Sequence, residues 1–152
     1  MDTVTRNDAV YLIAPKVNLS LDLVRSVLKG YTRYIRKSVE NGCSISFLRI
    51  CTIEVRDNVG YRETFAYTCT ELANELGVNP AAVKGILMCY EDIIIRDLKR
   101  YCDHSVTALF SLTRKETGGK IGVYIKRSNT LATEVNYILR MRHSFKRKVV
   151  GE

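Results

Sequence analysis

The side chains of this chain that could do chemistry are mainly cations, and they gather toward its end. The 152 residues include 24 Lys and Arg against 16 Asp and Glu, a formal net charge of +8. Residues 120–152 hold eight of the cations and two of the carboxylates. Such an excess attracts polyanions, nucleic acid first among them, although an acidic protein surface would satisfy the same charges. The candidate contact residues are Lys120, Lys126, Arg127, Arg140, Arg142, Lys146, Arg147 and Lys148.

Side chains suited to metal binding or covalent catalysis are not arranged for either. The five cysteines never form a Cys-x-x-Cys pair, and neither His104 nor His143 has a Cys or His at ligand spacing. Glu91 and Asp92 are adjacent, so they do not share one face of a helix. The chain has no glycine-rich phosphate loop. We therefore expect reduced thiols, no metal, no cofactor and no enzymatic activity.

Two long amphipathic helices are the main elements that must position the cations. Helical spacing of apolar residues predicts one helix over about 21–40 and another over about 80–101. Ser20 and Asn79 are suitable N-caps, and they are 59 residues apart. The matched apolar positions are Val24, Val27, Leu28, Tyr31, Ile35 and Val39 in the first helix, and Val83, Ile86, Leu87, Tyr90, Ile94 and Leu98 in the second. Fifty-nine residues is therefore a structural period.

Shorter elements complete each unit and give an α+β fold. Short helices are predicted over 8–14 and 71–76, and alternating apolar residues predict a β-hairpin over 43–56. Strand-like runs over 105–115 and 120–127 flank Thr117-Gly118-Gly119, a hairpin that is as compatible with a structural role as with a functional arm. A basic C-terminal helix is predicted over 131–148, where its late cations would also favour the helix end.

The resulting organisation has four parts. Residues 1–57 form the first unit, 58–69 an aromatic connection, 70–128 the second unit, and 129–152 the basic C-terminal helix. With 46% hydrophobic residues the chain has ample material for a core.

The first unit, in particular LSLDLVRSVLKGYTRYIRKSVENGCSISFLRICTIEVRD, resembles the N-terminal half of the HU/IHF family of histone-like DNA-bending proteins. The second unit, ELANELGVNPAAVKGILMCYEDIIIRDLKRY, is similar to the same helical pair. Two subunits intertwine in that family. The resemblance therefore implies two tandem HU/IHF-like units that form an internal pseudo-dimer or an unusual oligomer.

The chain departs from the family where the family bends DNA. Members usually carry Gly-Phe-Gly in the hairpin bend, where this chain has Arg49, Ile50 and Cys51. They also extend a long basic arm tipped by a proline that wedges between base pairs. The prolines here are Pro15 and Pro80, both at helix ends. The residues that kink the duplex in the family therefore have no counterpart.

An HU/IHF-like chain without the intercalating, proline-tipped arm is also similar to the IHF-like ring proteins of the head-to-tail connector in crAss-like bacteriophages. That resemblance implies a non-enzymatic virion protein, assembled in the host cytoplasm, that forms a homo-oligomeric ring with portal or tail components near double-stranded DNA. The alternative is an architectural DNA-binding protein, cytoplasmic and nucleoid-associated. No membrane partner is expected, because no apolar run approaches the roughly 18 residues that span a bilayer.

A sequence-specific regulator is a further reading, since residues 71–87 could form a helix-turn-helix. Its recognition helix would begin with Ala81, Ala82 and Gly85, which offer no side chains for base edges. A core helix is the better interpretation of this stretch.

Overall fold

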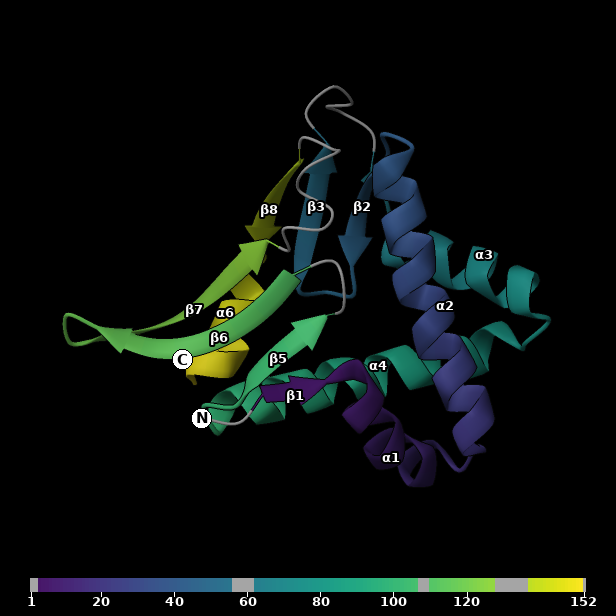
Figure 1. The fold of residues 1–152 in the computed structure, drawn as a ribbon, viewed down its shortest axis with the longest axis horizontal. Coiled ribbons are helices and arrows are strands. Elements are labelled where there is room, and N and C mark those ends of the chain that lie inside the picture. Colours follow the sequence, from purple (N-terminus) through teal and green to yellow (C-terminus); the bar gives the residue numbers. More distant parts are fainter. Residues whose placement is uncertain (1–2, 56–61, 107–109, 128–136, 152) are drawn as a thin grey trace.

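The chain folds into an α+β structure of helices and two small sheets, as predicted (Figure 1). This is a computed structural model that describes residues 3–55, 62–106, 110–127 and 137–151. The helices are α1 (Arg6–Val17), α2 (Leu21–Glu40), α3 (Phe65–Leu76), α4 (Pro80–Lys99) and α6 (His143–Val150). The strands are β1 (Thr3–Thr5), β2 (Ser44–Phe47), β3 (Cys51–Val55), β4 (Arg62–Glu63), β5 (Asp103–Val106), β6 (Phe110–Thr117), β7 (Lys120–Arg127) and β8 (Tyr137–Met141).

The two long helices confirm the prediction in their caps and their buried faces. The Ser20 hydroxyl accepts a hydrogen bond from the Leu23 amide, and the Asn79 side chain accepts one from the Ala81 amide. These bonds satisfy amides that the first turn of a helix leaves unpaired. All twelve apolar positions predicted from the spacing are buried, each with at most 1% of its surface exposed.

The 59-residue period also governs the short helices and the first strands. The helix α3 begins and ends 59 residues after α1, and β5 lies 59 residues after β2. The N-caps Thr5 and Thr64 keep the same offset. The prediction that the second short helix starts at residue 71 is wrong, because Thr64 is its N-cap and the helix begins at Phe65, six residues earlier. Much of the predicted connection over 58–69 is therefore helical, while its residues 58–61 lie outside the described part of the chain.

The two repeats exchange strands, so each sheet contains elements of both. The strand β1 pairs in parallel with β5, and β4 pairs in parallel with β2. The registers are related by the same period, since Thr3 is opposite Asp103 and Arg62 is opposite Ser44. The sheet orders are β1-β5-β6-β7 and β4-β2-β3-β8. The repeats therefore pair with each other within one chain.

Aromatic side chains join the two sheets to the helices in a shared core. The Phe47 ring on β2 lies 5.0 Å from the Phe110 ring on β6 and 5.5 Å from the Tyr31 ring on α2, measured between centroids. The Tyr31 hydroxyl accepts a 2.7 Å hydrogen bond from the amide of Leu48, whose backbone is left-handed at φ 48°. Phe47 and Tyr31 are both fully buried.

A charged contact across the repeats holds the turn between β2 and β3. Glu91 on α4 is 1% exposed, and its carboxylate accepts hydrogen bonds from the Arg49 amide at 2.8 Å and guanidinium at 2.7 Å. A carboxylate buried to this degree needs such partners, because desolvation without them is costly. The turn of the first repeat is thus fixed by a helix of the second.

The predicted C-terminal helix over 131–148 is wrong for much of its length. Residues 137–141 form β8, which pairs antiparallel with β3, and the helix α6 begins at His143. The proposed cap Thr130 and residues 131–136 lie outside the described part of the chain. Tyr137 is buried and Arg140, three residues later and therefore on the opposite face, is exposed, which suits a strand that covers the core with one face. Within the described residues, no helix is long and apolar enough to cross a bilayer.

The buried His104 gives the folded state a dependence on pH. Its Nε2 lies 2.7 Å from the Tyr90 hydroxyl, and burial lowers the pKa of His104 to about 4. The unfolded chain, with an ordinary histidine pKa near 6.5, binds more protons between these values, so stability falls as pH drops through that window. We predict that His104 accounts for a loss of about 3 kcal/mol in the free energy of unfolding between pH 6.5 and pH 4.

Urea unfolding of the natural chain and of His104→Gln across this pH range measures that loss. The difference between the two curves isolates the histidine from the carboxylates that titrate in the same range. Parallel curves would contradict the prediction.

Candidate nucleic-acid interface

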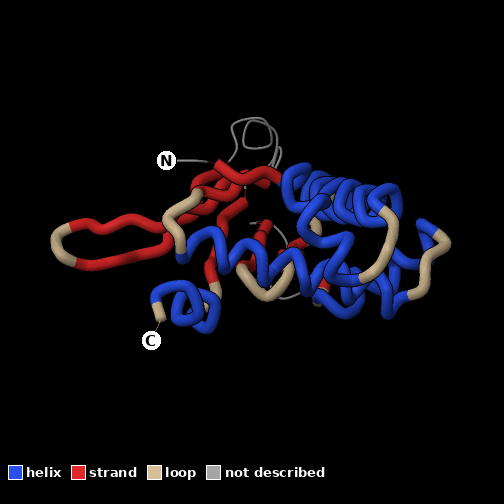
Figure 2. The backbone as a smooth tube through the Cα atoms, turned by 90° about the horizontal axis from the view of Figure 1, so that it is seen from below, coloured by secondary structure: helices blue, strands red, loops and turns tan. Residues whose placement is uncertain are grey.

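The hairpin of β6 and β7 extends well beyond the rest of the described chain (Figures 1 and 2). The two strands pair continuously from Phe110 opposite Arg127 to Thr117 opposite Lys120. Gly118 and Gly119 form the tip with φ values of 59° and 81°, a left-handed backbone that glycine adopts without strain. We call residues 110–127 the arm.

The two faces of the arm differ in chemistry because side chains alternate along each strand. Leu112 and Val123 are buried and lie on the face toward the core. The opposite face carries exposed cations and one exposed aromatic ring. We call this set the cationic arm face, and it consists of Lys115, Lys120, Tyr124 and Lys126.

The side chains of the cationic arm face are directed to solvent. The Lys115 ammonium lies 4.9 Å from the centroid of the Tyr124 ring, a cation–π contact that leaves the charge accessible. Register places Glu116 on the other face, opposite Ile121. The neighbouring Arg114 also lies on that other face, where it donates to the Lys99 carbonyl at 2.9 Å and covers the Tyr101 ring. Arg114, which has a structural role, and the accessible lysines therefore lie on opposite faces of the arm.

The eight predicted contact residues fall into three groups. Lys120 and Lys126 lie on the cationic arm face, and Arg127 ends β7 with its side chain outside the described residues. Arg140 lies on β8 in the other sheet, where it forms a 3.1 Å ion pair with Glu54. Its predicted place on a helix is wrong, and its charge is already neutralised.

The third group lies on or next to α6, whose cations are exposed. Arg142 is the N-cap residue of α6, and the helix itself carries Lys146, Arg147 and Lys148. Lys146 and Arg147 line one side of a groove of about 320 Å³ whose other side is β7. Lys146 and Arg147 therefore lie beside residues 121–124 of the arm, and the four cations are not distributed along a single long helix.

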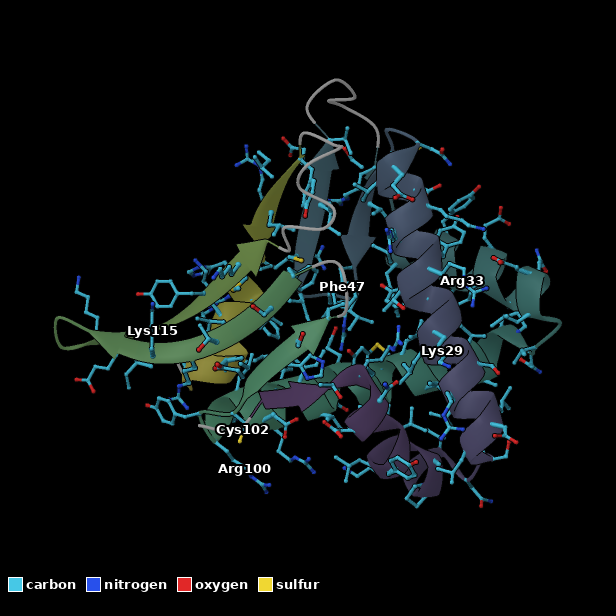
Figure 3. All side chains as sticks on the ribbon, viewed as in Figure 1. Lys29, Arg33, Phe47, Arg100, Cys102 and Lys115 are labelled. Carbon is cyan, nitrogen blue, oxygen red and sulfur yellow. The ribbon has the colours of Figure 1, made fainter. Side chains whose placement is uncertain are left out.

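Lys115 and Tyr124 were not among the predicted contact residues. Lys115 lies just before the Gly-Gly tip, within residues 60–119, which carry almost no net charge. A count of charges by segment therefore does not identify Lys115. The signal that identifies it is the two-residue alternation around the tip, which places Lys115, Lys120 and Lys126 on one face. Figure 3 shows Lys115 on the arm.

This arrangement is suited to the phosphate backbone of a nucleic acid. Lys120 and Lys126 are six residues apart on β7, which corresponds to roughly 20 Å along a strand. A two-stranded ribbon of this kind fits the major groove of B-DNA. Lysines supply charge to phosphates without reading sequence, and an exposed tyrosine can add hydrogen-bonded or stacking contact.

The described residues contain no group of three His, Cys, Asp or Glu side chains placed to hold a metal ion. The chain matches no known family model, and no curated protein is similar enough in sequence to match it.

Proposed function

We propose that the chain is a non-enzymatic structural protein of a phage virion, built from two HU/IHF-like units and assembled as a ring in the head-to-tail connector. Two features support the HU/IHF-like assignment. Helix, helix and hairpin occur twice with one period, and the repeats exchange β1 and β4 as the subunits of that family intertwine. The assignment implies that one chain takes the place of a dimer.

The observation that carries the proposal is that the described chain has one arm. The strands β6 and β7 are eight residues long and pair along their whole length, whereas β3, the counterpart of β6 in the first repeat, is five residues long and pairs with β2 and β8 in a sheet. A protein that bends DNA by clamping it needs contacts on both sides of the duplex and a wedge between base pairs. A single arm with a Thr-Gly-Gly tip supplies contact from one side only.

A one-sided contact suits a subunit of a ring. The ring would assemble on portal or tail proteins. Each copy in it would direct its cationic arm face toward DNA in the central passage. Weak contacts repeated around a ring add up through multivalency, so each arm needs only a few lysines. Contacts to phosphates alone would also leave DNA free to slide through the passage, because they carry no sequence information.

Sedimentation velocity and electron microscopy of the purified chain, alone and with portal or tail proteins, test this proposal. We expect a discrete multi-subunit ring on one face of its partner. A chain that stays monomeric with every such partner would contradict it.

The alternative proposal is an architectural DNA-binding protein, and the cationic arm face favours it independently of any ring. The two proposals differ in what they require of the duplex. An architectural protein must bend or compact DNA, whereas a ring subunit must only contact it.

A further inference from the structure

A second group of accessible cations lies on α2, far from the arm. Lys29, Arg33 and Lys37 follow one another at intervals of four residues, so they share one face of the helix. All three are exposed. Figure 3 shows Lys29 and Arg33 on α2, toward the other end of the long axis from Lys115 on the arm. We call these three residues the helix stripe.

The charges of the helix stripe are not neutralised, in contrast to their neighbours on the same helix. Arg25 pairs with Asp22 at 3.2 Å, and Arg36 pairs with Glu40 at 3.4 Å. Within the described part of the chain, no carboxylate lies within ion-pair distance of the three stripe residues. They are therefore available to an external anion.

The fold itself does not require these cations. The equivalent positions on α4, 59 residues later, are Met88, Asp92 and Arg96, and α4 has the same length as α2 with its caps at the equivalent positions. Like charges four residues apart also destabilise a helix, and the stripe contains two such pairs. The three cations therefore destabilise α2 locally, and the fold does not need them.

The composition of the stripe favours a polyelectrolyte over a protein surface. Protein interfaces have an apolar or aromatic centre within a charged rim. Among the described residues, Leu21 is the one exposed large apolar side chain on α2, and it lies two turns before Lys29. The span from Lys29 to Lys37 is about 12 Å of helix, which matches three to four successive phosphates of one DNA strand at about 3.4 Å each along the axis.

We propose that the helix stripe is a second contact for the phosphate backbone of double-stranded DNA, separate from the arm. The inference rests on the proposed contact with DNA, but it needs neither the ring nor the cationic arm face. With cationic surfaces toward both ends of its long axis (Figure 3), the chain would contact two separate DNA segments.

The test compares two variants that each remove two positive charges from α2. Lys29→Gln/Arg33→Gln removes stripe residues, and Arg25→Gln/Arg36→Gln removes cations that are already paired. We measure binding of a labelled duplex by fluorescence anisotropy from low to moderate salt. The stripe variant should lower the log–log salt slope by about 1.8, at about 0.9 for each phosphate contact, and the paired-cation variant by less than half of that.

Thermal unfolding checks that the stripe variant is folded. Its melting temperature should stay the same or rise by about 2 °C, because both like-charged pairs of the stripe are removed.

Several outcomes would overturn the inference. If the log–log salt slopes of both variants equal that of the natural chain, the helix stripe does not contact DNA. If the stripe variant loses binding to poly-glutamate while its DNA slope is unchanged, the stripe is a contact for an acidic protein. If the natural chain binds no DNA at all, both the helix stripe and the proposed contact of this chain with DNA are contradicted. If the stripe variant binds like the natural chain and only arm variants lose binding, the stripe is contradicted and the proposed contact with DNA stands.

Discussion

Replacing Phe47 by alanine should lower the free energy of unfolding by about 3–5 kcal/mol, the cost of removing a large aromatic ring from a packed core. Phe47 lies on one sheet and contacts Phe110 on the other and Tyr31 on the first long helix. The cavity would therefore open where both repeats meet, and the two sheets should lose stability together. Urea unfolding followed by far-ultraviolet circular dichroism and by tyrosine fluorescence measures this loss.

The second repeat provides the control for this prediction. Val106 occupies the position equivalent to Phe47, so Phe47→Val introduces a residue that the fold already accepts at the related site. This variant should cost less than Phe47→Ala, because part of the volume is kept. Two separate unfolding transitions in either variant, one for each repeat, would contradict the shared core.

Removing the charges of the arm should have the largest effect on DNA binding. Lys115→Gln/Lys120→Gln/Lys126→Gln deletes the three lysines of the cationic arm face, which are exposed. We expect affinity for a duplex to fall on the order of 100-fold at low salt, and the log–log salt slope to fall by about 2.7, at about 0.9 for each phosphate contact. Fluorescence anisotropy over a salt series gives both quantities.

The matched control removes three cations from the C-terminal helix instead. Lys146→Gln/Arg147→Gln/Lys148→Gln changes the net charge by the same amount, and these side chains are also exposed. This α6 variant should weaken the general electrostatic attraction to DNA, but it should keep most of the log–log salt slope of the natural chain. The opposite result, with the slope lost in the α6 variant and kept in the arm variant, would assign the contact to α6 and its groove beside β7.

The long helices could be predicted from the sequence because their signals are local. Six apolar positions at helical spacing and a capping residue lie within each stretch of about twenty residues, so no distant contact is needed to recognise them. The starts of the two short helices are predicted less well, because Thr5 and Thr64, 59 residues apart, are their caps, whereas the predicted starts at residues 8 and 71 miss both.

The remaining elements depend on partners that are distant along the chain. Tyr137–Met141 is compatible with a helix in isolation, and its strand conformation comes from pairing with β3, where Arg140 meets Glu54 86 residues earlier. The exchanged strands β1 and β4 are three and two residues long, too short for any periodic signal. The cationic arm face could be predicted in part, because its lysines follow strand alternation around a Gly-Gly tip.

The proposed function requires above all that the arm of this chain contacts a duplex from one side without bending it. The most direct test is energy transfer between dyes at the two ends of a short duplex, titrated with the purified protein at low and moderate salt. We predict binding that weakens steeply as salt rises, with no change in the end-to-end distance of the duplex. A saturable shortening that persists at moderate salt would contradict this account and establish an architectural protein that bends DNA with a single proline-free arm.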